Sequence, residues 1–160
     1  MAQFDLDIAV VGATGAVGEV MLEILAEREF TSGKVHALAS ERSAGKRVAF
    51  GNAHLTVADL ATFDFSSVAI ALFSAGGSVS EAYAPVAAGA GCVVIDNTSH
   101  FRREADVPLV ITEVNPEAIA GYTSRHIIAN PNCSTAQLVV ALKPIHDAAT
   151  IKRVVVASDD

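Results

Sequence analysis

Apolar residues in this chain follow two alternating patterns. One is the short continuous run, which is typical of buried strands in a parallel sheet. The other repeats apolar side chains every three or four positions, which places them on one face of a helix. The strand-like runs lie at 8–11, 35–39, 68–73, 92–95, 109–112, 127–129 and 151–157. Because these runs alternate with helical segments, the pattern predicts an α/β fold with a parallel sheet and helices on both of its faces.

The helical segments fill the gaps between those runs. Their apolar faces are Val17, Met21, Ile24 and Leu25 in the first helix, and Leu138, Leu142 and Ile145 in the last. A further helix is expected at 78–90, and Pro144 is expected to kink or end the last helix because it removes a backbone donor. The shorter expected elements are a strand pair at 46–50 and 54–57, a connection at 59–65 and a short helix at 116–120.

Composition excludes several classes of protein. The mean hydropathy is +0.41, yet no apolar run reaches the roughly 18 residues that a membrane-spanning helix needs. The formal net charge is −7 without a basic stripe, so neither a nucleic acid nor a membrane is expected as a partner. No basic region precedes the first apolar run, so we expect no signal peptide and a cytoplasmic location.

The two cysteines, Cys92 and Cys133, stand far apart in the sequence, and Cys92 lies in a predicted buried strand. A disulfide is therefore not expected, which fits a reducing compartment. No group of cysteines and histidines has the spacing of metal ligands, so no metal site is expected.

A glycine-rich turn follows the first predicted strand and opens the first predicted helix. A strand, a glycine turn and a helix form the start of a dinucleotide-binding unit, in which the helix N-terminus supplies N–H groups to the phosphates. The candidate cofactor residues of this turn are Gly12, Thr14, Gly15, Ala16, Val17 and Gly18. The spacing is GxxGxxG rather than GxGxxG, so a tight turn without a ligand stays open. We expect a Rossmann-like NAD(P)-binding domain.

The residues after the second predicted strand favour NADP over NAD. An acidic residue there binds the ribose hydroxyl of NAD, whereas an arginine accommodates the 2′-phosphate of NADP. Ser40, Arg42, Ser43 and Lys46 could form a phosphate cradle, and Glu41 is the contrary signal. The alternative is a solvated turn.

Two further strand ends carry candidate site residues. Ser74, Ala75 and Gly76 follow one strand, and small residues there line the crevice in which ligands bind to such sheets. Asn97 and Arg102 follow the next strand. An arginine suits an oxyanion because its guanidinium can donate two parallel hydrogen bonds.

Cys133 is the candidate nucleophile. It comes directly after Asn132, a natural N-cap residue, at the start of the last predicted helix. Unpaired N–H groups and the helix dipole favour an anion in this first turn, and a thiolate is the reactive form of cysteine. The alternative is a buried cysteine that serves as a small hydrophobic residue.

Taken together, the motifs resemble those of the bacterial aspartate-semialdehyde dehydrogenases, in the same order and spacing. They are GATGAVG at 12–18, SERSAGK at 40–46, FSAGGS at 73–78, DNTSHFR at 96–102 and NPNCST at 130–135. Members of that family are longer, so the chain resembles their N-terminal half. The resemblance implies reversible oxidation of L-aspartate 4-semialdehyde to 4-aspartyl phosphate with NADP and inorganic phosphate. This step belongs to lysine (diaminopimelate), methionine and threonine biosynthesis.

The resemblance also implies a role for each matching residue. Cys133 would form a thiohemiacetal with the aldehyde and then a thioester, which phosphate cleaves. Arg102, with Asn97 nearby, would bind phosphate. The cofactor residues would be Thr14–Val17 at the pyrophosphate, Ser40, Arg42 and Ser43 at the 2′-phosphate, and Ser74, Ala75 and Gly76 as a wall beside the cofactor.

The same resemblance divides the chain into two parts. Residues 1–132 would form the NADP-binding domain, and 133–160 would begin a catalytic and dimerisation domain whose remaining residues, among them the base histidine, are not present. The chain alone would then bind cofactor at best and would expose apolar surface at 138–145 and 151–157. The parent protein would be a homodimer or a dimer of dimers.

Two alternatives stay open, and one position departs from the family pattern. N-acetyl-glutamyl-phosphate reductases use the same thioester chemistry but have a glycine where this chain has Asn132. A nucleotide-binding module without catalysis is the other alternative. At His100 the family usually has a small residue, and no role is assigned to this histidine.

Overall fold

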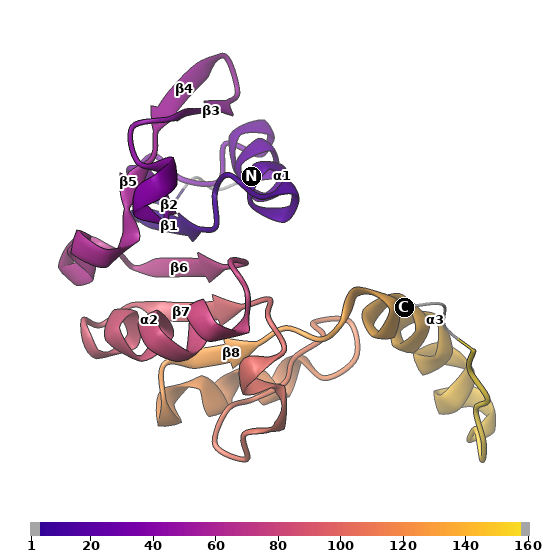
Figure 1. Ribbon diagram of the computed structural model, residues 1–160. Coiled ribbons are helices and arrows are strands. Elements are labelled where there is room, and N and C mark those ends of the chain that lie inside the picture. Colours follow the sequence, from indigo (N-terminus) through magenta and orange to yellow (C-terminus); the bar gives the residue numbers. More distant parts are fainter. Residues whose placement is uncertain (1–3, 158–160) are drawn as a thin grey trace.

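The computed structural model describes residues 4–157. Its main element is a sheet of six strands in the order β5-β2-β1-β6-β7-β8, and every neighbouring pair is parallel (Figure 1). The strands are β1 (Ile8–Val11), β2 (Val35–Ala39), β5 (Ala58–Asp59), β6 (Ile70–Phe73), β7 (Val93–Asp96) and β8 (Ile127–Ala129). The predicted α/β architecture with a parallel sheet is confirmed.

Helices cover both faces of this sheet. Successive strand residues point to opposite faces, and β1 divides its side chains accordingly. Val10 packs in one cluster with Leu22 of α1 (Ala16–Glu27). Ala9 and Val11 pack in the other with Ala84 of α2 (Gly77–Gly89). The core therefore lies in two layers, one on each side of the sheet.

Helix α1 turns only part of the predicted apolar face toward the sheet, since Met21 and Leu25 pack against the core but Val17 and Ile24 remain exposed. Val17 and Ile24 are 47% and 41% exposed, whereas Gly18 and Leu22 are buried. The reason is that Gly18 lies against the turn after β1, so the line that runs through Gly18 and Leu22 faces the sheet. Met21 is only partly buried beside it. A glycine at the point of closest approach decided the rotation of the helix.

The segment after β2 contains the expected strand pair and one strand that was not expected. β3 (Arg47–Phe50) and β4 (Ala53–Thr56) pair antiparallel, which confirms the hairpin. The expected connection at 59–65 is wrong at its start, because Ala58 and Asp59 form β5 on the edge of the main sheet. Two short 3-10 turns, η2 (Leu60–Thr62) and η3 (Phe65–Ser67), then lead to β6.

The strand expected at 109–112 is not formed. Leu109 makes a single bridge to Ala129 of β8. The side chain of Asn115 then accepts a hydrogen bond from the Ile111 N–H at 2.8 Å and donates one to the Leu109 carbonyl at 2.9 Å. These side-chain bonds occupy backbone groups that a strand would pair, so the chain turns instead. The helix expected at 116–120 is a longer 3-10 helix, η5 (Pro116–Ser124).

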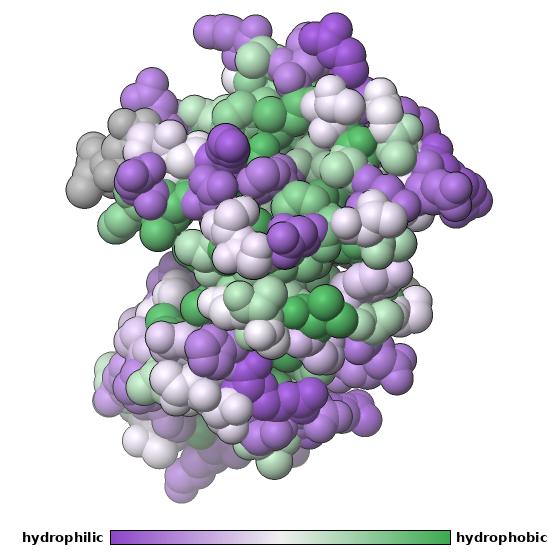
Figure 2. All heavy atoms as spheres, turned by 90° about the vertical axis from the view of Figure 1, so that its left-hand side faces the viewer, coloured by the Kyte–Doolittle hydropathy of each residue, from purple (hydrophilic) through white to green (hydrophobic). Residues whose placement is uncertain are grey.

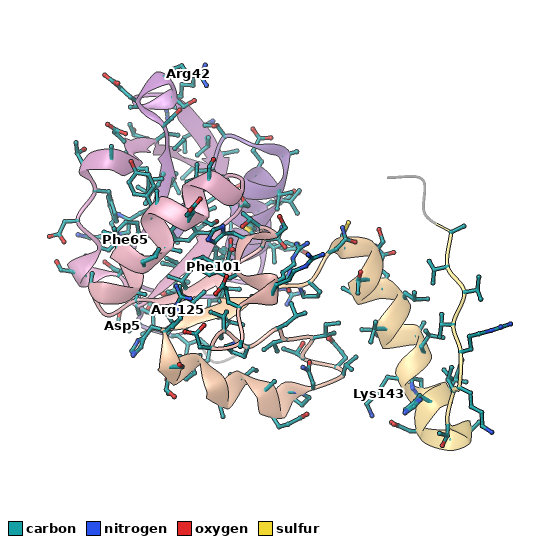
Figure 3. The ribbon with its side chains drawn as sticks, turned by 60° about the horizontal axis from the view of Figure 1, so that its bottom comes forward. Asp5, Arg42, Phe65, Phe101, Arg125 and Lys143 are labelled. Atoms are coloured by element: carbon teal, nitrogen blue, oxygen red, sulfur yellow. The ribbon has the colours of Figure 1, made fainter. Side chains whose placement is uncertain are left out.

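Helix α3 (Cys133–Ala149) projects away from the sheet after β8 (Figure 1). The helix continues past Pro144 to Ala149, so the expectation that it ends near Pro144 is wrong. The carboxylate of Asp147 accepts a hydrogen bond from Lys143 Nζ at 2.7 Å, and this pair bridges the proline on the helix surface. The chain reverses at Thr150 (φ 50°), and 151–157 run back beside α3 without strand pairing (Figures 1 and 3).

The strand expected at 151–157 is therefore absent, since the segment has no neighbouring strand among residues 4–157. The expected apolar exposure is confirmed. Val140 and Ile145 of α3 are 38% and 54% exposed, and Val155 is 83% exposed. No residue of α3 is buried.

The surface at the amino ends of the strands is mixed. Figure 2 looks at this side, which is the left of Figure 1, and shows hydrophilic side chains above and below with apolar ones between them. Within residues 4–157, every helix is too short or too polar to cross a bilayer.

Candidate functional site

The turn between β1 and α1 is built by close contacts of backbone with backbone. Gly12 has φ 92°, and a Cβ there would lie 3.0 Å from the Ala75 nitrogen and the Ser74 carbonyl carbon. A Cβ on Gly18 would overlap the Gly12 carbonyl oxygen. Gly15 is the N-cap residue of α1. Glycine therefore lets the strand turn and lets the helix pack closely, as the sequence predicted.

A cleft of about 550 Å³ opens at the carboxyl ends of β1, β2, β5 and β6. Its lining includes many of the predicted cofactor residues, namely Gly12, Thr14, Gly15, Ser40, Arg42, Ser74 and Ala75. The other predicted cofactor residues, Ala16, Val17, Gly18, Ser43 and Gly76, are not part of this lining. Gly18 is buried beneath the turn, and Gly76 caps α2.

The sequence did not indicate several residues that line the same cleft. They are Ala39, Asp59, Leu60, Ala61, Val79 and Tyr83, whereas Glu41, the contrary signal of the sequence, also lines the cleft. Asp59 belongs there because β5 pairs parallel with β2, with Asp59 opposite Ala39, so both strands end at the same edge. A strand of two residues leaves almost no periodic signal, and this is why the position was missed. Tyr83 reaches the cleft from α2.

The turn after β2 places an arginine at the rim of the cleft. Residues 41–43 form the 3-10 turn η1 (Glu41–Ser43), and the Gly45 N–H donates to the Val57 carbonyl at 2.9 Å, which fixes the end of the turn. Lys46 Nζ donates to Ser43 Oγ at 3.4 Å. Arg42 is exposed and has no hydrogen bond or ion pair to any of residues 4–157, and Figure 3 shows it pointing outward.

A second group of site residues lies at the ends of β7 and β8. Arg102 belongs to the 3-10 turn η4 (His100–Arg103). Its Nε–H donates to the Asn130 carbonyl at 2.9 Å, and one of its terminal N–H groups donates to the Asn97 carbonyl at 3.0 Å. The Asn130 side chain also donates to Asn97 Oδ1 at 2.7 Å. A guanidinium has five N–H donors, so Arg102 keeps further donors for an anion.

His100 and Phe101 anchor this turn. Phe101 is 1% exposed, and the guanidinium of Arg125 lies 5.2 Å from its ring centroid. Both residues are labelled in Figure 3. The His100 ring meets the Phe101 ring edge-on at 4.6 Å. A Cβ on Gly77, at the start of α2, would lie 3.9 Å from the His100 Cβ. His100 therefore lies between the turn and the N-terminus of α2.

Cys133 is the first residue of α3 and is exposed. Asn132 is the N-cap, as predicted, and its side-chain oxygen accepts the Ser134 N–H at 2.9 Å and the Thr135 N–H at 3.3 Å. The alternative of a buried cysteine is wrong for this position. The chain that leads to Cys133 passes Asn130, whose carbonyl holds Arg102.

Cys92 has the opposite environment. Its side chain is buried, and its S–H donates to the Val68 carbonyl at 2.9 Å. Burial raises the pKa of the Cys92 thiol to about 11. Only Cys133 of the two thiols is accessible, and the two cysteines form no disulfide. Among residues 4–157 no cluster of metal-ligating side chains is found.

Comparison with known proteins shows the family. Residues 7–122 match the model of the semialdehyde dehydrogenase NAD-binding domain. An aspartate-semialdehyde dehydrogenase from a Shewanella species is 58% identical over 154 residues, which are 96% of this chain and 46% of that protein. The chain thus spans about half the length of the curated relatives it matches.

Solved structures agree with this result. A crystal structure of aspartate semialdehyde dehydrogenase II from Vibrio cholerae, complexed with ASA, has a TM-score of 0.90 and 60% identity, covering 93% of this chain and 49% of that one. The Candida albicans enzyme with NADP has a TM-score of 0.76 and 28% identity, covering 92% and 48% of the two chains. The chain therefore belongs to the semialdehyde dehydrogenase family and corresponds to the N-terminal, NAD-binding half of the aspartate-semialdehyde dehydrogenases.

Proposed function

We propose that the chain is the cofactor-binding half of an aspartate-semialdehyde dehydrogenase that uses NADP and inorganic phosphate. The observation that supports this best is the placement of two groups at one edge of the sheet. The cleft opens at the ends of β1, β2 and β6, and Arg102 and Cys133 follow the ends of β7 and β8. Ligands of open parallel sheets bind beyond the carboxyl ends of their strands.

The cleft fits a dinucleotide with an additional phosphate. Gly12 leaves its floor free of side chains, and the first turn of α1 has N–H groups without partners inside the helix, which suit a pyrophosphate. Arg42 stands at the rim with its guanidinium unpaired among residues 4–157. Arginine binds phosphate by parallel hydrogen bonds, so it would hold the 2′-phosphate that distinguishes NADP from NAD.

The residues of the second group supply the rest of the proposed reaction. The Cys133 thiolate adds to the aldehyde carbon to give the thiohemiacetal as its alkoxide, which loses a hydride and becomes a thioester. NADP, when bound, accepts that hydride. Arg102 holds inorganic phosphate, and a phosphate oxygen attacks the thioester carbon. The carbon–sulfur bond then breaks, 4-aspartyl phosphate leaves, and the Cys133 thiolate is restored.

The same proposal divides the chain between two domains at residue 132. Helix α3 buries none of its residues and leaves Val140 and Ile145 exposed, which suits a helix that packs against a second, catalytic and dimerisation domain. Residues 158–160 of the proposed second part lie outside the described residues. In this proposal the chain alone binds cofactor without turnover, and the whole protein is a homodimer or a dimer of dimers.

Calorimetric titration of the chain with NADP and with NAD tests the cofactor assignment. We expect tighter binding of NADP. Arg42→Ala should weaken NADP about 10-fold or more and leave NAD unchanged, since a hydrogen bond to a charged group contributes about 1.5–3 kcal/mol. Arg47→Ala is the control, because Arg47 is also exposed but does not line this cleft. Equal affinity for the two cofactors, or no effect of Arg42→Ala, would refute the assignment.

A further inference from the structure

Asp96, the last residue of β7, is a fully buried carboxylate without a cationic partner. Its exposed fraction is 0%, and no ion pair joins it to any of residues 4–157. Instead, Oδ1 accepts the Ser80 hydroxyl at 2.8 Å and the Thr98 N–H at 3.1 Å, and Oδ2 accepts the Thr98 hydroxyl at 2.8 Å. A charged group without these bonds would be expensive to bury, so the bonds determine where Asp96 can lie.

The bonds of Asp96 join three parts of the chain. Ser80 belongs to α2, whereas Thr98 belongs to the loop that leads to η4. Thr98 Oγ1 also accepts the His100 N–H at 3.3 Å, which extends the network to the first residue of η4. The carbonyl of Asp96 accepts the Asn130 N–H at 2.8 Å, three residues before Cys133.

Arg102 lies between the two segments that Asp96 fixes. Its guanidinium donates to the carbonyls of Asn97 and Asn130, which directly follow the backbone held by Asp96. A displacement of residues 97–100 would therefore move the Asn97 carbonyl and break one of the two hydrogen bonds that hold the guanidinium.

We propose that Asp96 is a positioning residue, which acts through Thr98 to hold the Arg102 guanidinium at the strand ends so that its remaining N–H groups face an incoming oxyanion. The oxyanion is inorganic phosphate if the proposed function holds, so this part of the inference rests on that function. The claim that Asp96 fixes the position of Arg102 does not depend on the proposed function.

Two variants separate positioning from simple stability. Thr98→Val keeps the shape of the side chain but removes the hydroxyl that connects Asp96 to η4. Ser80→Ala is the matched control, because it removes a 2.8 Å bond to the same carboxylate on the side of α2. Both variants are expected to lower the free energy of unfolding in urea, whereas only Thr98→Val should loosen Arg102.

The primary measurement is the solvent exchange rate of the Arg102 Nε–H by NMR in the free chain. We expect Thr98→Val to raise this rate at least about fivefold and Ser80→Ala to leave it within about twofold, because exchange reports local opening. Thr98→Ser, which keeps the hydroxyl, should restore the original rate. If Thr98→Val does not fold, Thr98→Ala makes the same test, since it also removes the hydroxyl that donates to Asp96 Oδ2.

A Thr98→Val rate equal to that of the original chain overturns the proposal, and so does an equal rise in Ser80→Ala. Titration with inorganic phosphate, with Arg102→Ala as reference, separates the two claims. If Thr98→Val loosens Arg102 but Arg102→Ala leaves phosphate binding unchanged, the positioning role stands and the phosphate site of the proposed function fails. If Thr98→Val and Arg102→Ala both weaken phosphate binding, the positioning role of Asp96 and the phosphate site at Arg102 are both supported.

Discussion

Replacing Gly18 by alanine tests the contact that seats α1 on the sheet. Alanine is the better helix former, by about 1 kcal/mol, so helix propensity alone predicts a more stable protein. The structure predicts the opposite. A Cβ on Gly18 would overlap the Gly12 carbonyl oxygen and would lie 2.8 Å from the Gly12 carbonyl carbon and 2.9 Å from the Ala13 Cα.

The magnitude follows from the kind of atoms involved. All three atoms belong to the backbone, and Gly12 and Ala13 are held in turn by N–H bonds to the Leu38 carbonyl of β2 at 2.9 and 3.1 Å. The turn cannot move away from the added Cβ without displacing its hydrogen bonds to β2. Overpacking of this kind costs about 1–3 kcal/mol, and with two strand-anchored residues we expect the upper part of that range. When the gain of about 1 kcal/mol in helix propensity is subtracted from an overpacking cost of about 3 kcal/mol, the expected net loss of unfolding free energy is about 2 kcal/mol.

Urea unfolding followed by circular dichroism measures this difference. Gly89→Ala is the matched control, because Gly89 also lies in a helix but a Cβ there would meet no atom within 4 Å. We expect Gly89→Ala to raise the unfolding free energy by about 0.4–1 kcal/mol. If Gly18→Ala were as stable as the original chain, the close contact between α1 and the turn would not exist.

Three further predictions concern individual side chains. Iodoacetamide at neutral pH should alkylate exposed Cys133 and spare Cys92 until the chain unfolds, which peptide mass spectrometry measures; equal labelling in the folded chain would contradict the burial of Cys92. Asn132→Ala should destabilise the start of α3 by about 1 kcal/mol, seen as faster amide exchange there, and unchanged exchange would show that the cap contributes nothing. Arg125→Met should lower stability by about 0.5–1 kcal/mol, since it loses the cation–ring contact with Phe101 and the exposed ion pairs with Asp106 and Glu104; a stability that is unaffected in urea would refute this.

Much of the fold could be predicted because most of its strands are short apolar runs, of which β1 is buried at every position and β6 and β7 alternate between buried and partly buried residues. The runs that form β1, β2, β6, β7 and β8 are continuous and apolar, and they need no partner to be recognised. β5 has only two residues and was missed, since its position depends on pairing with β2. The run at 109–112 looked the same as the others, but the Asn115 side chain diverted its backbone.

The site shows the same division between local and distant causes. The glycines of the first turn, the N-cap at Asn132 and the placement of Arg102 after β7 follow from local chemistry, and the sequence indicated all of them. Asp59 and Tyr83 line the cleft because separate segments meet at one sheet edge, and no local pattern marks them. The hydrogen bonds of Asp96 could not be predicted from the sequence either, since the bond to Ser80 forms only when α2 packs beside β7 in the folded chain.

The most direct test of the proposed function is a chimera with a relative. The chain would replace the matching N-terminal part of the Vibrio cholerae aspartate semialdehyde dehydrogenase II, to which it is 60% identical. We predict phosphate-dependent reduction of NADP with L-aspartate 4-semialdehyde, abolished by Cys133→Ser and retained by Cys92→Ser. A folded, NADP-binding chimera without this activity, or activity that survives Cys133→Ser, would contradict the proposed function.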